Sequence, residues 1–420
     1  MKRRLLSVLM VAMLSVGVLA GCQGESKPKD NGAGTDGEVK EVELKVWAPE
    51  NQVQSGTIES MTKSFQEEHP EWKITFTVEA VGEDVAKDQI LKDPEAAADV
   101  YFFANDQLSG LIDAGAIAKL GGSTEEMVKS TMDETVVNTV THDGSIYGIP
   151  FTHNTFFMYY DKTLIPEDSI GSVEKIVQAA TANDVYNFVF DSAGGWKLGA
   201  WYYGAGLSIY GEDGNDYAKG SDWNSEKGLA VTNYLVDLIN NPKVAYNDDV
   251  SLSELTAAHR VGAWFDGSWN YNLYKDALGD DLGVAVLPTF NPDGTDYQLK
   301  AFYGSKVIGV NSNSKNPEVA VALAAYLGSE EMQVKRYEET NQVPTNKTAG
   351  SSDAVKADEV ATAIIGVVEK ASIMQPTSSE FGNKYWTNAG AIATEIRNGE
   401  LTKANAQERL DKFVDNMKVE

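Results

Sequence analysis

The sequence predicts an α/β protein in which helices cover a parallel sheet on both faces. Near the start of the chain, β-rich segments at 42–48, 73–81 and 99–104 alternate with helical segments at 56–69 and 84–91. The third strand, DVYFFA, is apolar after its first residue, as in strands that are buried on both sides. This alternation is typical of a parallel sheet, which binds ligands at the carboxyl ends of its strands.

The same alternation continues through the rest of the chain. Strands are expected at 187–190, 261–267 and 282–288, and a long helix at 225–241. The C-terminal third reads as helices, notably at 317–329 and 401–417. A chain of 420 residues with 42% hydrophobic content can bury a substantial core, and two domains are the default expectation at this length.

Charge and cysteine content exclude several classes of function. The chain has 62 acidic and 35 basic residues, a net charge of -27 that disfavours binding to nucleic acid. Its single cysteine allows no disulfide within the chain, and its four histidines have no zinc-type spacing. We therefore expect no metal site, no cofactor and no nucleic-acid partner.

The first 21 residues have the pattern of an export signal. A basic start at 1–4 precedes a long apolar run, and Ala20 and Gly21 are small residues that a signal peptidase accepts. A transmembrane helix is the alternative, but the apolar run is shorter than the ~20 residues that a bilayer core requires. The segment LAGC at 19–22 resembles the bacterial lipobox, which implies that Cys22 is lipid-modified and anchors the protein to a membrane.

Residues 22–40 predict a flexible tether, because they are rich in Gly, Ser, Pro and charged residues and contain no aromatic side chain. Within this tether, residues 32–37 match the G-x-G-x-x-G pattern of dinucleotide-binding loops. That pattern functions only between a strand and a helix, and neither is expected here. We therefore predict no nucleotide site.

The aromatic residues indicate a function more clearly than the carboxylates do. The sequence has no nucleophile elbow, H-E-x-x-H motif or Walker loop, although its many Asp and Glu residues leave a two-carboxylate glycosidase possible. Aromatic residues with polar neighbours recur at predicted strand ends, for example at Trp47, Phe103, Trp196 and Trp269. Flat rings beside hydrogen-bonding groups suit a sugar, whereas ordinary core packing is the alternative for any single ring.

Six segments, at 98–120, 143–166, 233–239, 262–272, 282–290 and 373–386, resemble the maltose- and maltodextrin-binding proteins of ABC sugar importers. The similarity extends over about residues 42–417. It implies a type II periplasmic-binding-protein-like fold with two α/β lobes, each a mainly parallel sheet flanked by helices, hinged by crossovers. The implied N-terminal lobe comprises residues 41–151 and 303–344, and the C-terminal lobe comprises residues 152–302 and 345–420.

The resemblance implies a monomeric receptor, not an enzyme, that binds maltooligosaccharides between its lobes and delivers them to the transmembrane subunits of a permease. It would be lipid-anchored to the outer face of the cytoplasmic membrane of a Gram-positive bacterium. Phe103 and Asp106 would be a stacking ring and a hydroxyl acceptor. The ligand-binding residues implied by motif position are Trp47, Glu50, Asn51, Glu83, Asp84, Phe103, Asp106, Asn154, Trp196, Trp269 and Trp386.

The chain departs from the maltose-binding pattern at three places. Gln107 replaces an Arg, Asn154 replaces an acidic residue, and residues 194–196 replace an acidic-Pro-aromatic triplet. These changes remove charged hydrogen-bonding partners, so the length and linkage of the glycan stay open. A different oligosaccharide, or a secreted glycoside hydrolase that uses similar aromatic residues, remains an alternative.

Overall fold

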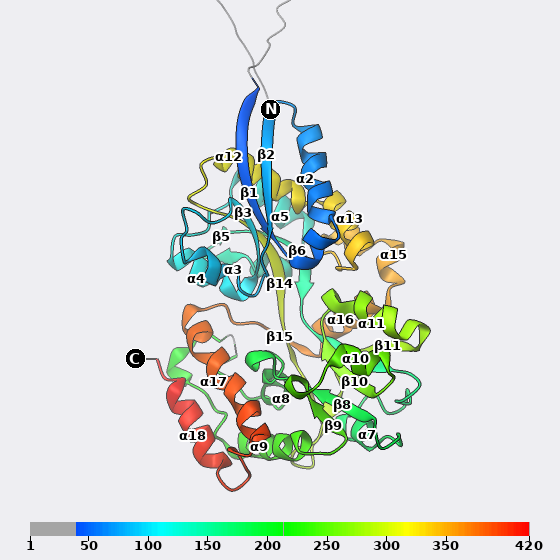
Figure 1. Cartoon of the computed structure of the whole chain (residues 1–420). Coiled ribbons are helices and arrows are strands. Elements are labelled where there is room, and N and C mark those ends of the chain that lie inside the picture. The colour runs from blue at the N-terminus through cyan, green and yellow to red at the C-terminus, as the bar shows by residue number, and fades with distance from the viewer. Residues whose placement is uncertain (1–38, 213, 420) are drawn as a thin grey trace, which may run out of the picture. The chain divides into compact units, whose positions relative to one another are not determined.

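The computed structural model describes residues 39–212 and 214–419 (Figure 1). The predicted export signal, Cys22 and the glycine-rich segment at 32–37 lie outside the described residues. No helix among the described residues combines the length and apolarity needed to cross a membrane.

One sheet, which we call the N-terminal sheet, has the strand order β15-β14-β3-β1-β2, with β6 also paired to β14. The strands β1 and β2 pair in parallel along their whole length, from Lys40 opposite Trp72 to Ala48 opposite Ala80. Its strands are β1 (Lys40–Ala48), β2 (Trp72–Ala80), β3 (Val100–Ala104), β6 (Ile149–Asn154), β14 (Ala301–Val310) and β15 (Ser372–Met374).

Helices flank this sheet and bury their apolar sides against it. The side chains of Ile58 and Phe65 from α2 and Leu323 from α12 join Val46 and Phe102 from the strands in one buried core. The flanking helices are α2 (Thr57–Glu68), α3 (Ala86–Ile90), α4 (Leu108–Asp113), α5 (Gly122–Thr131), α6 (Glu134–Asn138), α12 (Pro317–Leu327) and α13 (Glu330–Thr340). We call this part of the molecule the N-terminal lobe.

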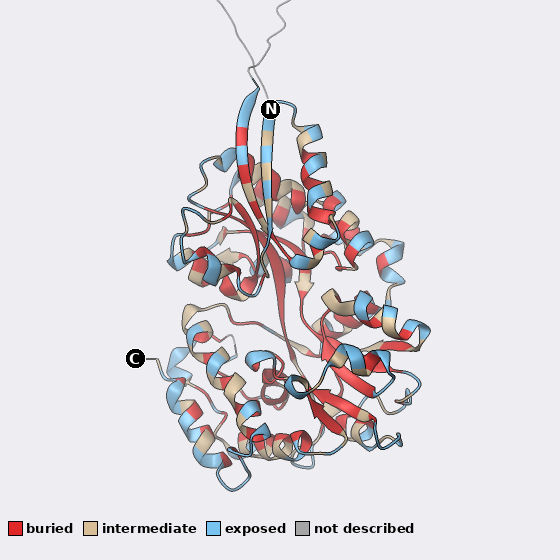
Figure 2. Ribbon diagram, viewed as in Figure 1, coloured by how far each residue is buried: buried red, intermediate tan, exposed pale blue. Residues whose placement is uncertain are grey.

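A second sheet has the order β11-β7-β10-β8-β9 and a separate buried core. Its strands are β7 (Phe157–Asp161), β8 (Tyr186–Phe190), β9 (Val244–Tyr246), β10 (Val261–Asp266) and β11 (Leu282–Ala285). The helices of this part are α7 (Val173–Gln178), α8 (Gly199–Gly204), α9 (Glu226–Ile239), α10 (Leu252–Ala257), α11 (Tyr271–Leu278), α16 (Glu359–Lys370), α17 (Ser379–Arg397) and α18 (Ala406–Asn416). We call it the C-terminal lobe, and Figure 2 shows its buried strands beneath helices with exposed outer faces.

Serine side chains cap the N-termini of two of the long helices of this lobe. The Ser225 hydroxyl accepts a hydrogen bond from the backbone N–H of Gly228 at the start of α9, and Ser378 does the same for Phe381 at the start of α17. Such caps satisfy backbone donors that the first helical turn leaves unpaired. Both helices therefore begin where the sequence supplies a serine.

The strand β14 belongs to both cores. Phe302 near its start is buried in the C-terminal core, whereas Val307 and Ile308 are buried in the N-terminal core. The strand is seen between the two sheets in Figure 1. The chain also passes from one core to the other between Phe151 and Phe156, and again after Met332. Lobes joined by a few extended segments can rotate as rigid bodies about those segments.

The sheets are more mixed than the expected mainly parallel arrangement. In the N-terminal sheet, β14 is antiparallel to β3 and β6, and in the C-terminal sheet β7 is antiparallel to both β10 and β11. The antiparallel strands include β14, β6 and β7. The chain passes between the cores within β14 and between β6 and β7, which are consecutive in the sequence but belong to different sheets. The predicted residue boundaries of the lobes stay a prediction.

The strand β14 was not predicted from the sequence, because the C-terminal third has the pattern of helices. Gly304 and Gly309 weaken the strand signal of this segment, and at both positions a Cβ would crowd a neighbouring side chain. A Cβ at Gly304 would lie 2.0 Å from the Asn105 Oδ1, which accepts a hydrogen bond from the Ser305 N–H. Glycine in a strand often marks such a close approach.

Candidate functional site

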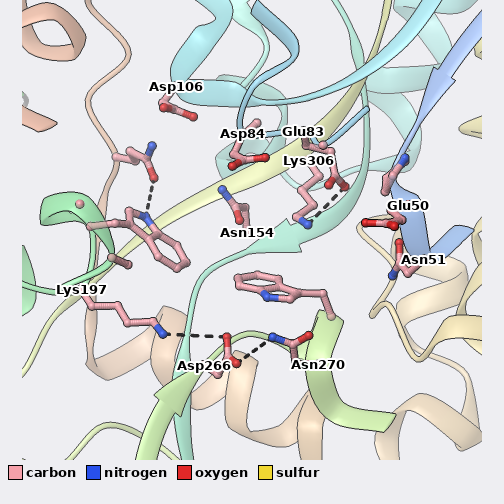
Figure 3. Close-up of a pocket in the computed structure, with 18 of the residues that line it drawn as sticks. Glu50, Asn51, Glu83, Asp84, Asp106, Asn154, Lys197, Asp266, Asn270 and Lys306 are labelled. Carbon is pink, nitrogen blue, oxygen red and sulfur yellow. Dashed lines mark hydrogen bonds and ion pairs between the residues drawn. The ribbon is translucent and has the colours of Figure 1, made fainter. Parts of the chain in front are cut away.

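A cavity of about 920 Å³ lies between the two lobes, within the range of small-molecule sites. Figure 3 shows polar side chains from both lobes pointing into it. It is lined by Pro49, Glu50, Asn51, Gln54, Gly82, Glu83, Asp84, Ala104, Asp106, Asn154, Ala193, Gly194, Trp196, Lys197, Asp266, Trp269, Asn270, Lys306, Gln375 and Trp386.

The N-terminal lobe supplies its polar groups from the ends of parallel strands. Glu50 and Asn51 begin the short helix α1 (Glu50–Gln54) after β1, Glu83 and Asp84 follow β2, and Asp106 lies in the turn η1 (Asn105–Gln107) after β3. The carboxyl ends of parallel strands meet at one edge of a sheet. Segments that are far apart in the sequence therefore place several carboxylates on one wall.

Lys306 balances the negative charge of one of these carboxylates, that of Glu83. Its Nζ lies 3.2 Å from the Glu83 Oε1, and each side chain is 11% exposed. The same ammonium lies 4.6 Å from the centre of the Trp269 ring, which belongs to the C-terminal lobe. Nearly buried charges need a partner of opposite sign, and an aromatic face also attracts a cation. Lys306 therefore contacts groups from both lobes at once.

Burial raises the pKa of Asp106 to about 7. A backbone hydrogen bond and then the charge of Lys87 lower this pKa in part, and the charge of Asp84, the smallest of these effects, raises it. No ion pair of Asp84 or Asp106 with a Lys, Arg or His occurs among the described residues. These two carboxyl groups can accept hydrogen bonds from a ligand, and the protonated form of Asp106 can also donate one.

Gln107, where the maltose-binding pattern has Arg, does not line the cavity. Its amide oxygen accepts a hydrogen bond from the Lys87 N–H, and its amide nitrogen donates to the Glu83 carbonyl. The side chain is 6% exposed. Gln107 therefore connects the loop after β2 with the start of α3 and orients the carboxylates rather than the ligand.

On the C-terminal wall, the carboxylate of Asp266 at the end of β10 accepts hydrogen bonds from several neighbouring groups. It accepts hydrogen bonds from the Gly267 N–H at 2.8 Å, the Asn270 amide at 2.9 Å and the Tyr274 hydroxyl. The Lys197 Nζ lies 4.0 Å from the Asp266 carboxylate, and a dashed line marks this ion pair in Figure 3. These partners hold Asp266 in a single position.

Lys197 is held as firmly. Its Nζ lies 2.6 Å from the Asp191 carboxylate and donates to the Phe265 carbonyl at 2.7 Å, and its side chain is 8% exposed. A nearby carboxylate and carbonyl offset the desolvation cost of a buried lysine. It contributes a fixed positive charge to the cavity wall.

Indole rings form the apolar part of the cavity. Trp196 and Trp269 have ring centres 6.0 Å apart, and Trp196 also packs against Phe156 at 4.8 Å. Trp386 in α17 lies 5.7 Å from Phe302. Rings supported from behind by other aromatic side chains present rigid faces for the C–H groups of a ligand.

The structure brings together most of the residues predicted from the sequence. Those that line the cavity are Glu50, Asn51, Glu83, Asp84, Asp106, Asn154, Trp196, Trp269 and Trp386. Their individual roles toward a ligand stay predictions.

The placement of Phe103 and Trp47 in the cavity was wrong. Phe103 is completely buried in the N-terminal core, because β3 is covered on both faces, so its ring cannot stack on a ligand. Trp47 lies within β1 opposite Glu79 of β2, and its indole donates a hydrogen bond to the Glu79 carboxylate at 2.7 Å. It packs against the core instead of lining the cavity.

Six charged or polar lining residues were not among those predicted: Gln54, Lys197, Asp266, Asn270, Lys306 and Gln375. Lys197 follows Trp196 directly, and Gln375 lies in the segment at 373–386 that carries the resemblance, so both could have been found by position. Lys306 lies on β14, which was not predicted, and its partner Glu83 is more than 200 residues away in the sequence. No local signal identifies that pair.

Among the described residues, no group of three or more His, Cys, Asp or Glu side chains could hold a metal ion. The cavity instead combines apolar ring faces with fixed hydrogen-bonding groups. This arrangement can bind a neutral, hydroxyl-rich molecule through stacking and paired hydrogen bonds.

Known proteins are similar to this chain over most of its length. The galactooligosaccharide-binding protein of Bacillus subtilis (strain 168) is 26% identical over 90% of this chain and 89% of its own length. A maltooligosaccharide ABC transporter solute-binding lipoprotein of Streptococcus pneumoniae (strain ATCC BAA-255 / R6) is 26% identical over 83% of this chain and 81% of its own.

A solved structure determined with acarbose is 41% identical to this chain, with a TM-score of 0.84 over 90% of this chain and 98% of that one. At this identity and coverage the two chains share their fold and family. The model of bacterial extracellular solute-binding proteins matches residues 60–363, which is well over half of the chain. This chain therefore belongs to the bacterial extracellular solute-binding protein family.

Proposed function

We propose that this protein is the sugar receptor of an ABC importer and that it binds α-1,4-linked glucan oligosaccharides in the cavity without cleaving them. The observation that carries the proposal is that three supported indole rings and several carboxylate and amide groups converge on one cavity from both lobes. Each ring suits one face of a pyranose, and each polar group suits its hydroxyls.

The names of the relatives support an oligosaccharide as the ligand, but they name different oligosaccharides. The pneumococcal relative is named for maltooligosaccharides, and the similar solved structure was determined with acarbose. The Bacillus subtilis relative is named for galactooligosaccharides, which makes a galactose-containing oligosaccharide the second candidate.

The proposed mechanism is closure of the lobes around the sugar. The lining carboxylates other than Asp266 lie on the N-terminal lobe and the indoles lie on the C-terminal lobe, so a sugar contacts both sets only when the lobes are close. Its higher affinity for the closed form shifts the population toward that form. The permease then distinguishes occupied from empty receptor by its shape.

The proposed location is the outer face of the cytoplasmic membrane, with the lipid on Cys22 as the anchor. The pneumococcal relative is named as a lipoprotein. Anchoring would keep the receptor beside the permease, and replacing Cys22 by Ala should move the protein from the membrane fraction to the medium.

Isothermal titration calorimetry with a panel of sugars tests the ligand. We expect maltotriose, maltotetraose and acarbose to bind with micromolar dissociation constants, which correspond to about -8 kcal/mol. Galactooligosaccharides should bind at least about tenfold more weakly. Chromatography of maltotetraose after prolonged incubation should return the intact sugar, whereas shorter products would identify a hydrolase.

Small-angle scattering tests closure. We expect the radius of gyration to decrease when the sugar selected by calorimetry is added at saturation. An unchanged scattering profile with a sugar that binds would reject the closure mechanism and leave sugar binding intact.

A further inference from the structure

Gln375 lies in the cavity wall and has no role in the function described so far. It follows β15 directly, and its backbone N–H donates a hydrogen bond to the carbonyl of Tyr303 on β14 at 2.9 Å. The residue is 2% exposed and lines the cavity. Gln375 is therefore anchored beside the start of β14, at the point where β15 ends.

The orientation of its side-chain amide follows from the chemistry of its neighbour. The Trp196 Nε1 lies 3.2 Å from the Gln375 Oε1. An indole N–H can only donate a hydrogen bond, so the amide must turn its oxygen toward Trp196. The amide nitrogen, Nε2, with its two N–H donors, must then point in the other direction.

The donors on Nε2 are left for a ligand. No described residue accepts a hydrogen bond from this atom, and it is not among the polar atoms that are both fully buried and unpaired. The atom is therefore open to the space that Gln375 lines, which is the cavity. It differs in this respect from Lys197, which already has two protein partners.

Nε2 also complements the opposite wall. Glu50 and Asp84 present carboxylates, which accept hydrogen bonds, whereas Nε2 only donates them. The ring oxygen and the glycosidic oxygen of a sugar can only accept, so a carboxylate cannot recognise them. A neutral and fixed N–H donor can, at little cost in conformational entropy.

We propose that Gln375 determines specificity by donating a hydrogen bond from Nε2 to an oxygen of the sugar unit beside Trp196. Trp196 then has two roles: its face contacts the sugar, and its N–H fixes the amide of Gln375. The inference rests on the proposed sugar-binding function. A ligand without an oxygen at this position would leave a buried donor unpaired, and sites of this kind reject such ligands strongly.

The decisive variant is Gln375→Glu, because it keeps the acceptor for Trp196 and replaces the donor with an acceptor. We expect the dissociation constant of the sugar that wild type binds best to rise at least about tenfold, measured by calorimetry. The matched control is Gln178→Glu, which adds the same charge at an exposed position of α7 and should bind like wild type. If Gln375→Glu does not fold, Gln375→Met removes the donor without adding charge and is subject to the same expectation.

A double-mutant cycle with Trp196→Phe tests the link between the two residues. Trp196→Phe keeps an aromatic face and loses the N–H, so we expect its effect and that of Gln375→Glu to be less than additive. Fully additive effects, or wild-type affinity in a folded Gln375→Glu variant, would overturn the inference. Failure of wild type to bind every sugar of the panel would instead reject the proposed function.

Discussion

The ammonium group of Lys306 lies 4.6 Å from the centre of the Trp269 ring and thereby connects the shared strand β14 with the C-terminal wall of the cavity. The same group is 3.2 Å from Glu83. A sugar that stacks on this face of Trp269 must displace Lys306 or share the ring with it. Sugar affinity and the stability of this charge cluster are therefore connected.

We expect Trp269→Ala to weaken binding of the preferred glycan by about 10- to 100-fold, because stacking on an aromatic ring contributes on the order of 1–3 kcal/mol. Calorimetry measures the change, and the melting temperature should change little because the ring lies at the cavity surface. The control is Tyr217→Ala, which removes an exposed ring in the turn η3 (Tyr217–Lys219). Equal affinities for Trp269→Ala and wild type would remove Trp269 from the site.

Lys306→Met should lower the free energy of unfolding by about 3 kcal/mol, because it leaves Glu83 nearly buried without its charged partner. Urea unfolding at neutral pH measures this difference. The double variant Lys306→Met with Glu83→Gln should recover most of the loss, since no unpaired charge is left. A double variant as unstable as Lys306→Met alone would show that the pair contributes nothing beyond packing.

Asp106 should make the empty protein less stable as the pH rises from about 4 to about 7. Burial raises its pKa from 3.8 to about 7, so in this range the folded state holds a proton that the unfolded state has released. The stabilisation is complete below the unfolded pKa and is lost as the pH rises through the folded one. The free energy of unfolding of Asp106→Asn, relative to that of wild type, should therefore be at least about 1 kcal/mol higher at pH 8 than at pH 4.

Urea unfolding of both proteins at the two pH values tests this expectation. Asp353→Asn, at the start of α15 (Asp353–Lys356), is a control for loss of one carboxylate from an exposed position. A difference between Asp106→Asn and wild type that does not change with pH would contradict the raised pKa. The same variant should also weaken glycan binding if Asp106 accepts a sugar hydroxyl.

Trp223→Ala should destabilise the C-terminal lobe by about 3–5 kcal/mol. Trp223 is completely buried, with its ring stacked 3.8 Å from Tyr202 of α8 and 4.8 Å from Phe413 of α18. Thermal and urea unfolding measure the loss. Leu273→Ala, which removes a side chain that is 49% exposed, should have little effect. A loss below about 1 kcal/mol for Trp223→Ala would show that this stack is not central to the core.

The first three strands were predicted to within about two residues, because apolar and β-branched residues concentrate in them and the chain between them has helical periodicity. The strand β14 was missed because its glycines serve packing against Asn105 and Tyr101, which are about 200 residues away. Predicted strand ends led to Asp106 and Trp269, which line the cavity, and also to Phe103, which lies in the core. The residue pattern along one strand does not show which of its side chains are covered by helices packed on the two faces of the sheet.

The sequence by itself determined the first three strands and the helical segments between them, the position of carboxylates and indoles near strand ends, and, through the family resemblance, an oligosaccharide as the expected class of ligand. These properties are local, since they depend on residue type and on periodicities of a few positions. Only the tertiary structure decided which distant side chains meet, such as Lys306 with Glu83 and Trp269, or Gln375 with Trp196. The physical reason is that β14 and β15 pair with strands far away in the chain, and only this pairing brings their side chains to the cavity.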